Sequence, residues 1–162
     1  MNPRSKSELV KKYGDLVDRQ DPDRSASIFD DDYSNSFPNY LRRVVVQING
    51  AYDHRLYDCC LVMIRRLIET LIIEIYESQG RASEIQDTSG HFFMLSNLLS
   101  HLKKDDHNNI GRRSEKALEH YKVMSDTAAH NRRFNAKKFH ITDQLVDFRI
   151  AIDELRQMAG FN

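Results

Sequence analysis

The chain has 162 residues, of which 40% are hydrophobic and 30% are charged, and its formal net charge at pH 7 is zero. This length and composition predict one globular domain with a single hydrophobic core. The few glycines and prolines (6 and 3) argue against a turn-rich β-sandwich or barrel, and two adjacent cysteines, Cys59 and Cys60, exclude a disulfide framework. Both cysteines lie in an apolar run, so we expect both to be buried.

Residues 1–36 are predicted to form an acidic N-terminal arm or linker, with eight acidic and six basic side chains. The apolar spacing within it predicts a short helix from Ser5 to about Gln20, followed by an Asp- and Ser-rich loop. The start of the sequence contains no apolar signal segment, so we expect a cytoplasmic protein.

Residues 37–162 are predicted to form the helical domain. Pro38 suits a first helical turn with Ser36 as its cap, and the helix that follows bends near His54 and Arg55. The next helix, from about Leu56 to Ser78, is apolar on most sides, which is typical of a central helix. Its charged residues exclude a membrane span.

In three further segments the apolar residues recur at helical spacing, which predicts three more helices. Together they predict an all-α antiparallel bundle of about five helices. The expected helices are 92–102 with Ser89 or Thr88 as cap, 112–130, and a last helix capped by Thr142 and stopped by Gly160.

His130 is the first candidate for a functional residue, because it ends an amphipathic helix and is followed by Asn131, Arg132 and Arg133. One interpretation is structural: a cationic histidine suits a helix C-terminus, and Asn131 can adopt the left-handed conformation there. The other interpretation makes His130 a general acid or base, with Arg132 or Lys122 stabilising a phosphate.

Lys122, Asp126 and His130 are spaced by four residues and therefore share one face of the helix. They are either an exposed row with a Lys–Asp pair or one wall of a polar cleft. Arg65, Arg66 and Glu69 interrupt the central helix, where a charge must be hydrated or paired. If they face the His130 row, they complete a polar site.

The connector 132–140 contributes to the one basic segment of the chain, residues 101–140, which has ten basic and five acidic side chains. Arg132, Arg133, Lys137 and Lys138 alternate with aromatic residues, a composition that suits phosphate contacts and base stacking. The alternative is a loop whose two phenylalanines pack into the core.

The sequence predicts no metal site and no cofactor. His120, His130 and His140 are ten residues apart, and ten residues on a helix turn about 80° away from the starting face. The sequence contains no metal-binding Cys pair or His-Glu-x-x-His pattern, no Gly-rich phosphate loop and no nucleophile elbow.

Two separated motifs resemble the family called domain of unknown function 4145. The first is the segment 52–69, with its Arg65-Arg66-Leu67-Ile68-Glu69 ending, and the second is the segment 122–130, which ends in Ala128-Ala129-His130. This family is similar to the HEPN superfamily of helical bundles. The resemblance implies a nucleic-acid-related role in a prokaryotic defence or toxin-type system. In active members, a metal-independent ribonuclease site pairs an Arg with a His, with four to six residues between the two.

No basic residue stands at that spacing before His130, since Lys122 is one residue too far. The first hypothesis is therefore a non-catalytic or degenerate module that binds RNA, another nucleic acid or a protein partner. The second is a ribonuclease with His130 as acid or base, and the third is a helical dimerisation module. A homodimer fits all three.

Overall fold

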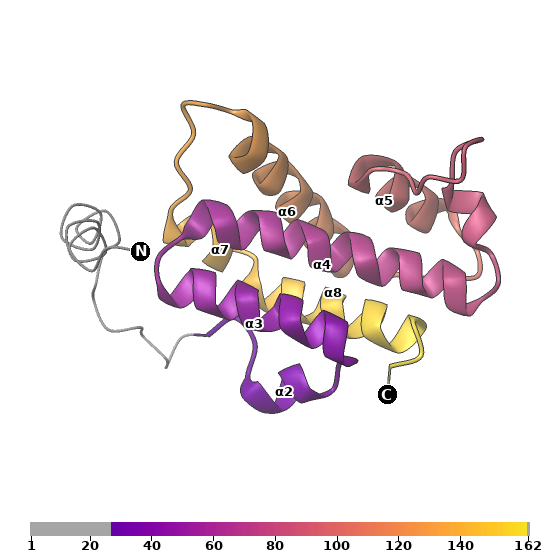
Figure 1. The fold of residues 1–162 in the computed structure, drawn as a ribbon, viewed down its shortest axis with the longest axis horizontal. Helices are drawn as coiled ribbons and strands as arrows, with labels where there is room; N and C mark the ends of the chain where they lie inside the picture. The colour runs from indigo at the N-terminus through magenta and orange to yellow at the C-terminus, as the bar shows by residue number, and fades with distance from the viewer. Residues whose placement is uncertain (1–26, 162) are drawn as a thin grey trace, which may run out of the picture.

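The computed structural model describes residues 27–161, which form a bundle of seven α-helices and one short 3-10 helix (Figure 1). This part of the chain contains no β-strand, only an isolated bridge between Gln86 and Phe92. The all-α class is confirmed. There are more helices than the five expected because two connectors form short helices, α2 (Asp31–Asn35) and α7 (Lys138–Thr142). The helix expected at Ser5 to Gln20 lies outside the described residues.

Helix α4 (Tyr57–Ser78) is the central helix, as its apolar sequence predicts. Its buried residues recur every three or four positions along most of its length and form one broad face, which several neighbouring helices cover. In Figure 1, α3 lies below α4 and α6 crosses above it. The helices that pack on α4 include α3 (Asn39–Asp53), α5 (Leu95–Lys104), α6 (Arg112–His130) and α8 (Leu145–Met158).

The two predicted chain breaks are confirmed by the backbone. Arg55 has a φ of 59°, and this left-handed residue separates α3 from α4 at the expected bend. Gly160 has a φ of 81° just after α8, where a glycine relieves the steric cost of that conformation.

The predicted N-terminal caps are wrong. Pro38, Met94 and Gln144 stand at the N-cap positions of α3, α5 and α8, and none makes a side-chain cap hydrogen bond. The hydroxyl groups are used elsewhere: Ser36 Oγ donates to the Tyr33 carbonyl (2.7 Å), and Thr142 Oγ1 donates to the Lys138 carbonyl (3.3 Å). Local competition of short hydroxyl side chains for nearby carbonyls explains the difference.

The end of the segment assigned by sequence to the arm belongs to the core. Ile28 and Phe29 are 0% and 2% exposed. The side chain of Asn49 on α3 bonds to both backbone groups of Phe29: its Oδ1 accepts the Phe29 N–H (3.0 Å), and its Nδ2 donates to the Phe29 carbonyl (2.7 Å). Arg149 Nε donates to the Ile28 carbonyl at 2.6 Å. The folded domain thus includes residues before Phe37, because this polar stretch contains adjacent large apolar side chains.

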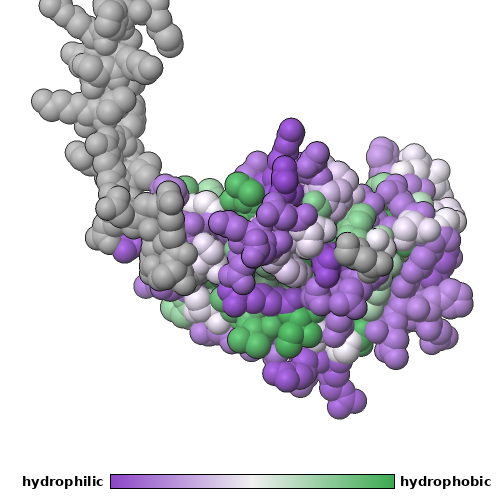
Figure 2. Space-filling model, turned by 90° about the horizontal axis from the view of Figure 1, so that it is seen from below, coloured by the Kyte–Doolittle hydropathy of each residue, from purple (hydrophilic) through white to green (hydrophobic). Residues whose placement is uncertain are grey.

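Only one of the two cysteines is buried, because adjacent helical residues point about 100° apart: Cys60 lies in the core and Cys59 is exposed. No helix in the described part of the chain is both long and apolar enough to cross a membrane. Figure 2 shows a mostly hydrophilic face with separate apolar patches.

Candidate functional site

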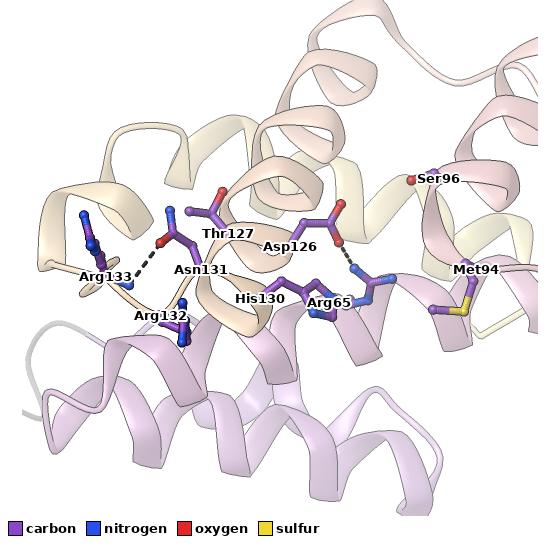
Figure 3. Close-up of a pocket in the computed structure, with 9 residues that line it drawn as sticks. All are labelled: Arg65, Met94, Ser96, Asp126, Thr127, His130, Asn131, Arg132 and Arg133. Carbon is purple, nitrogen blue, oxygen red and sulfur yellow. Dashed lines mark hydrogen bonds and ion pairs between the residues drawn. The ribbon is translucent and has the colours of Figure 1, made fainter.

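An open cleft of about 800 Å³ lies beside the C-terminal end of α6 (Figure 3). Its walls come from α4, α6, the start of α5 and the loop that follows α6. We call it the α6 cleft. The residues that line it are Arg65, Met94, Ser96, Asp126, Thr127, His130, Asn131, Arg132 and Arg133.

Three small residues of α6 are buried: Ser114, Ala117 and Ser125 are at most 1% exposed. Small side chains in a helix contact allow close packing, and α6 packs on α4 and α8. Ser125 satisfies its buried hydroxyl by donating to the Lys122 carbonyl at 3.0 Å. The next residue, Asp126, then lies at the edge of the helix–helix contact, where it meets α4.

Arg65 connects α4 to the wall formed by α6. Its guanidinium group forms an ion pair with Asp126, and its Nε donates to Glu69 Oε1 at 2.9 Å. The Arg65 side chain is only 14% exposed, so the two carboxylates compensate for its removal from water. Of the three predicted charges of the central helix, Arg65 and Glu69 form a structural pair, and Arg65 alone also meets the His130 row, through Asp126. Arg66 is exposed and lies outside the α6 cleft.

The turn after α6 presents two arginines. Asn131 donates its backbone N–H to the Thr127 carbonyl (2.9 Å), and its Oδ1 accepts the backbone N–H of Arg133 (3.0 Å), the contact drawn in Figure 3. Asn131 is not left-handed as expected, with φ −93° and ψ 105°, because its side chain stabilises an extended turn. Arg132 and Arg133 are exposed, and no described residue forms an ion pair with them.

His130 is exposed at the end of α6 and lines the α6 cleft, but Lys122, one end of the predicted row, does not. Lys122 Nζ lies 3.4 Å from Glu119 Oε1 instead. Burial alone would raise the pKa of Glu119, but Lys103 and Lys122 outweigh it and lower this pKa. Lys122 is thus engaged by a carboxylate away from the cleft, and only Asp126 and His130 of the row reach it.

The basic connector is divided between two places. Lys137 and Lys138 are exposed at the start of α7, outside the α6 cleft, and Lys138 Nζ lies 6.0 Å from the centre of the Tyr52 ring. Helix α7 is held against α6, since the buried Tyr121 hydroxyl donates to the Ile141 carbonyl. The two arginines of the connector therefore line the α6 cleft, and the two lysines do not.

The two phenylalanines of the connector differ in burial. Phe134 is partly buried and packs against the core, whereas Phe139 is 51% exposed. Core packing of the connector's phenylalanines, the alternative interpretation, therefore holds for Phe134 and not for Phe139.

Three residues of the α6 cleft were missed by the sequence analysis. Thr127 could have been found, because it is one turn before Asn131 on the helix already chosen. Met94 and Ser96 carry no local signal, because only the packing of α5 beside α6 brings them to the cleft.

In the described part of the chain, no group of three or more His, Cys, Asp or Glu residues could hold a metal ion. The fold and the site thus define an all-α domain with an arginine-rich cleft. Comparison of the chain with family models, curated proteins and solved structures found no match.

Proposed function

We propose that the chain is a non-catalytic module that binds single-stranded nucleic acid, RNA in the first place, through phosphate contacts in the α6 cleft. The observation that carries this proposal is the pair of exposed arginines, Arg132 and Arg133, with no acidic partner among the described residues. Planar guanidinium groups bind phosphate oxygens by two parallel hydrogen bonds. The one carboxylate in the lining, Asp126, is paired with Arg65 and does not neutralise them.

The other residues of the cleft suit a polynucleotide strand. Ser96, Thr127 and Asn131 offer hydroxyl and amide groups, which commonly hydrogen-bond to phosphates and sugars. Met94, 66% exposed, adds an apolar surface at the end of the cleft away from Arg133 in Figure 3. A cleft of about 800 Å³ is in the size range of small-molecule sites, which favours unpaired nucleotides over a duplex.

The two motifs that resemble the domain of unknown function 4145 family, which is similar to the HEPN superfamily, support the same proposal. Arg65 belongs to the first motif and Asp126 to the second, and their ion pair joins the motifs at the cleft. A role in a prokaryotic defence or toxin-type system follows from this resemblance. The cleft is formed by one copy of the chain, so the proposed binding does not require the homodimer expected from the sequence.

A metal-independent ribonuclease is the second candidate, favoured by the position of His130 beside Arg132 in the lining. Cleavage of RNA by its 2′-hydroxyl needs one group to accept a proton and another to donate one. The lining holds a single imidazole, Asp126 is paired with Arg65, and Lys122 is paired with Glu119. These contacts favour binding without cleavage.

The test is fluorescence anisotropy with a labelled oligouridine in the presence of a chelator, measured over a range of KCl concentrations. We expect Arg132→Glu combined with Arg133→Glu to weaken binding by about tenfold or more at low salt, because each charge reversal abolishes the binding of one phosphate. The slope of log K against log salt should fall by roughly 0.7 for each phosphate that is no longer neutralised. The matched control is Arg42→Glu with Arg43→Glu, two exposed arginines on α3, which should bind nearly as the wild type does.

The same samples, run on a denaturing gel, decide between the candidates. We expect intact RNA with the wild type and with His130→Ala. Cleavage by the wild type that His130→Ala abolishes would make the protein a ribonuclease. No binding at low salt would overturn nucleic-acid binding and favour a dimerisation module or a protein partner.

A further inference from the structure

We propose a second subsite, on the outer face of α5, that binds an unpaired nucleobase of the strand held in the α6 cleft. This inference rests on the proposed function, because the strand itself is the ligand. The subsite is a separate cavity of about 200 Å³, which we call the α5 groove. It is lined by Phe93, Asn97, Ser100, His101 and Lys104.

The α5 groove lies on the side of the helix that faces away from the core. The leucines of α5 are buried on the opposite side, so Asn97, Ser100, His101 and Lys104 form its exposed face. A polar outer face is usual for an amphipathic helix. This one differs because it is hollowed and contains two stacked rings: the Phe93 and His101 centroids are 5.3 Å apart, with planes at 28°.

The stacked pair offers a flat surface for a base. His101 is exposed while Phe93 is partly buried beneath it, so the platform is fixed on one side and open on the other. Stacking on such rings accepts any base, because every base has a π-face. Asn97, whose amide has both donors and an acceptor, is exposed beside the rings and could hydrogen-bond to a base edge.

The groove also has a cation for the neighbouring phosphate. Lys103 is occupied, since its Nζ lies 3.2 Å from Glu115 and 3.3 Å from Glu119. Lys104, the next residue, is exposed and has no acidic partner among the described residues. The charge that remains available on this helix therefore lies in the α5 groove.

One strand can reach both cavities. Met94 and Ser96 line the α6 cleft, while Phe93 and Asn97, their immediate neighbours, line the α5 groove. The first turn of α5 thus borders both of them. The helix rises by about 12 Å from Ser96 to Lys104, at 1.5 Å per residue. A nucleic-acid strand that passes Arg65 and leaves the α6 cleft over Met94 would therefore need to extend by about this length to reach Lys104 in the α5 groove.

The experiment compares two probes of equal length, an oligouridine and the same ribose-phosphate chain without bases. We expect His101→Ala to weaken binding of the oligouridine by about fivefold or more, in keeping with the removal of one stacked base, and to leave binding of the abasic chain unchanged. The control is His107→Ala, an exposed histidine in the α5–α6 loop, which should alter neither affinity.

A second variant tests the phosphate contact. Lys104→Ala should weaken binding of both probes and lower the salt slope by roughly 0.7, whereas Lys116→Ala, an exposed lysine on α6, should not. The subsite is overturned if wild-type protein binds both probes and His101→Ala has no effect, or weakens both equally. If the wild type binds neither probe, the proposed function itself fails.

Discussion

At the scale of single residues, Arg65 shows how a costly charge is built into the central helix. Its guanidinium group is shared between Glu69, one turn along α4, and Asp126 on α6. Partly buried ion pairs add little net stability, but removing one partner leaves a charge uncompensated. In the α6 cleft the pair has a further consequence: the Asp126 carboxylate occupies a guanidinium that could otherwise bind a phosphate.

Asp126→Asn should therefore strengthen binding of oligouridine roughly threefold to tenfold, because Arg65 becomes available and a negative charge leaves the cleft. Glu69 still compensates Arg65, so the fold should persist. Titration of the labelled strand at constant salt measures the effect. The control is Asp31→Asn, which removes an exposed carboxylate on α2. It changes the net charge by the same amount and should bind oligouridine as the wild type does. Equal affinities for Asp126→Asn and the wild type would contradict this competition.

At the scale of elements, one buried carboxylate ties the end of α4 to the α5–α6 loop. Asp105, with 6% of its side chain exposed, accepts hydrogen bonds from Arg81 Nη1 (2.9 Å), Asn108 Nδ2 (2.7 Å) and the backbone N–H of His107 (3.0 Å). Burial by itself would raise the pKa of Asp105, but these donors outweigh it and hold the pKa well below its usual range.

Because the pKa of Asp105 is lower in the folded state than in the unfolded state, its contribution to stability is present at neutral pH. This contribution is lost as the pH falls below about 4. Asp105→Asn should lower the free energy of unfolding by about 2–4 kcal/mol at pH 7 and by clearly less at pH 3. Urea unfolding at the two pH values measures both. The control is Asp106→Asn at the neighbouring exposed residue, which should change the free energy of unfolding very little. If Asp105→Asn lowers the free energy of unfolding by the same amount at both pH values, the charge of Asp105 does not account for its contribution to stability.

At the scale of the whole molecule, one core joins the helices with the segment that precedes them. Phe29 stacks on Tyr33 at 5.4 Å and contacts Phe148 of α8 at 5.9 Å between ring centroids. Phe148 in turn lies 4.2 Å from Tyr121 of α6. Aromatic contacts therefore run from the start of the described chain to the helix that carries the cleft.

Phe29→Ala should lower the free energy of unfolding by about 3–5 kcal/mol, since a fully buried ring leaves a cavity that the packed helices cannot refill. Phe139→Ala removes the same side chain from a half-exposed position on α7 and should cost less than about 1 kcal/mol. Thermal or urea unfolding of the two variants gives the comparison. Similar losses of stability for both would mean that the segment before α2 is not part of the cooperative core.

Strong periodicity made several features predictable. The apolar stripes predicted the central helix and the helix that ends at His130 almost to the residue, because burial of one face dominates the energetics of a long helix. The capping residues were not predictable, since Ser36 and Thr142 bond to carbonyls of the short helices α2 and α7. A hydrogen bond to a nearby carbonyl and a true N-terminal cap differ in free energy by only about 1 kcal/mol, so sequence alone does not decide between them.

Three features could be predicted without the tertiary structure: the all-α class, the core of α4, and the row that brings Asp126 and His130 to one helix face. They depend on contacts only three or four residues apart. The tertiary structure alone decided that Arg65 meets Asp126 and that α5 supplies Met94 and Ser96. It also separated Lys137 and Lys138 from the cleft. These outcomes depend on how helices far apart in the chain pack, and helix periodicity does not encode that packing.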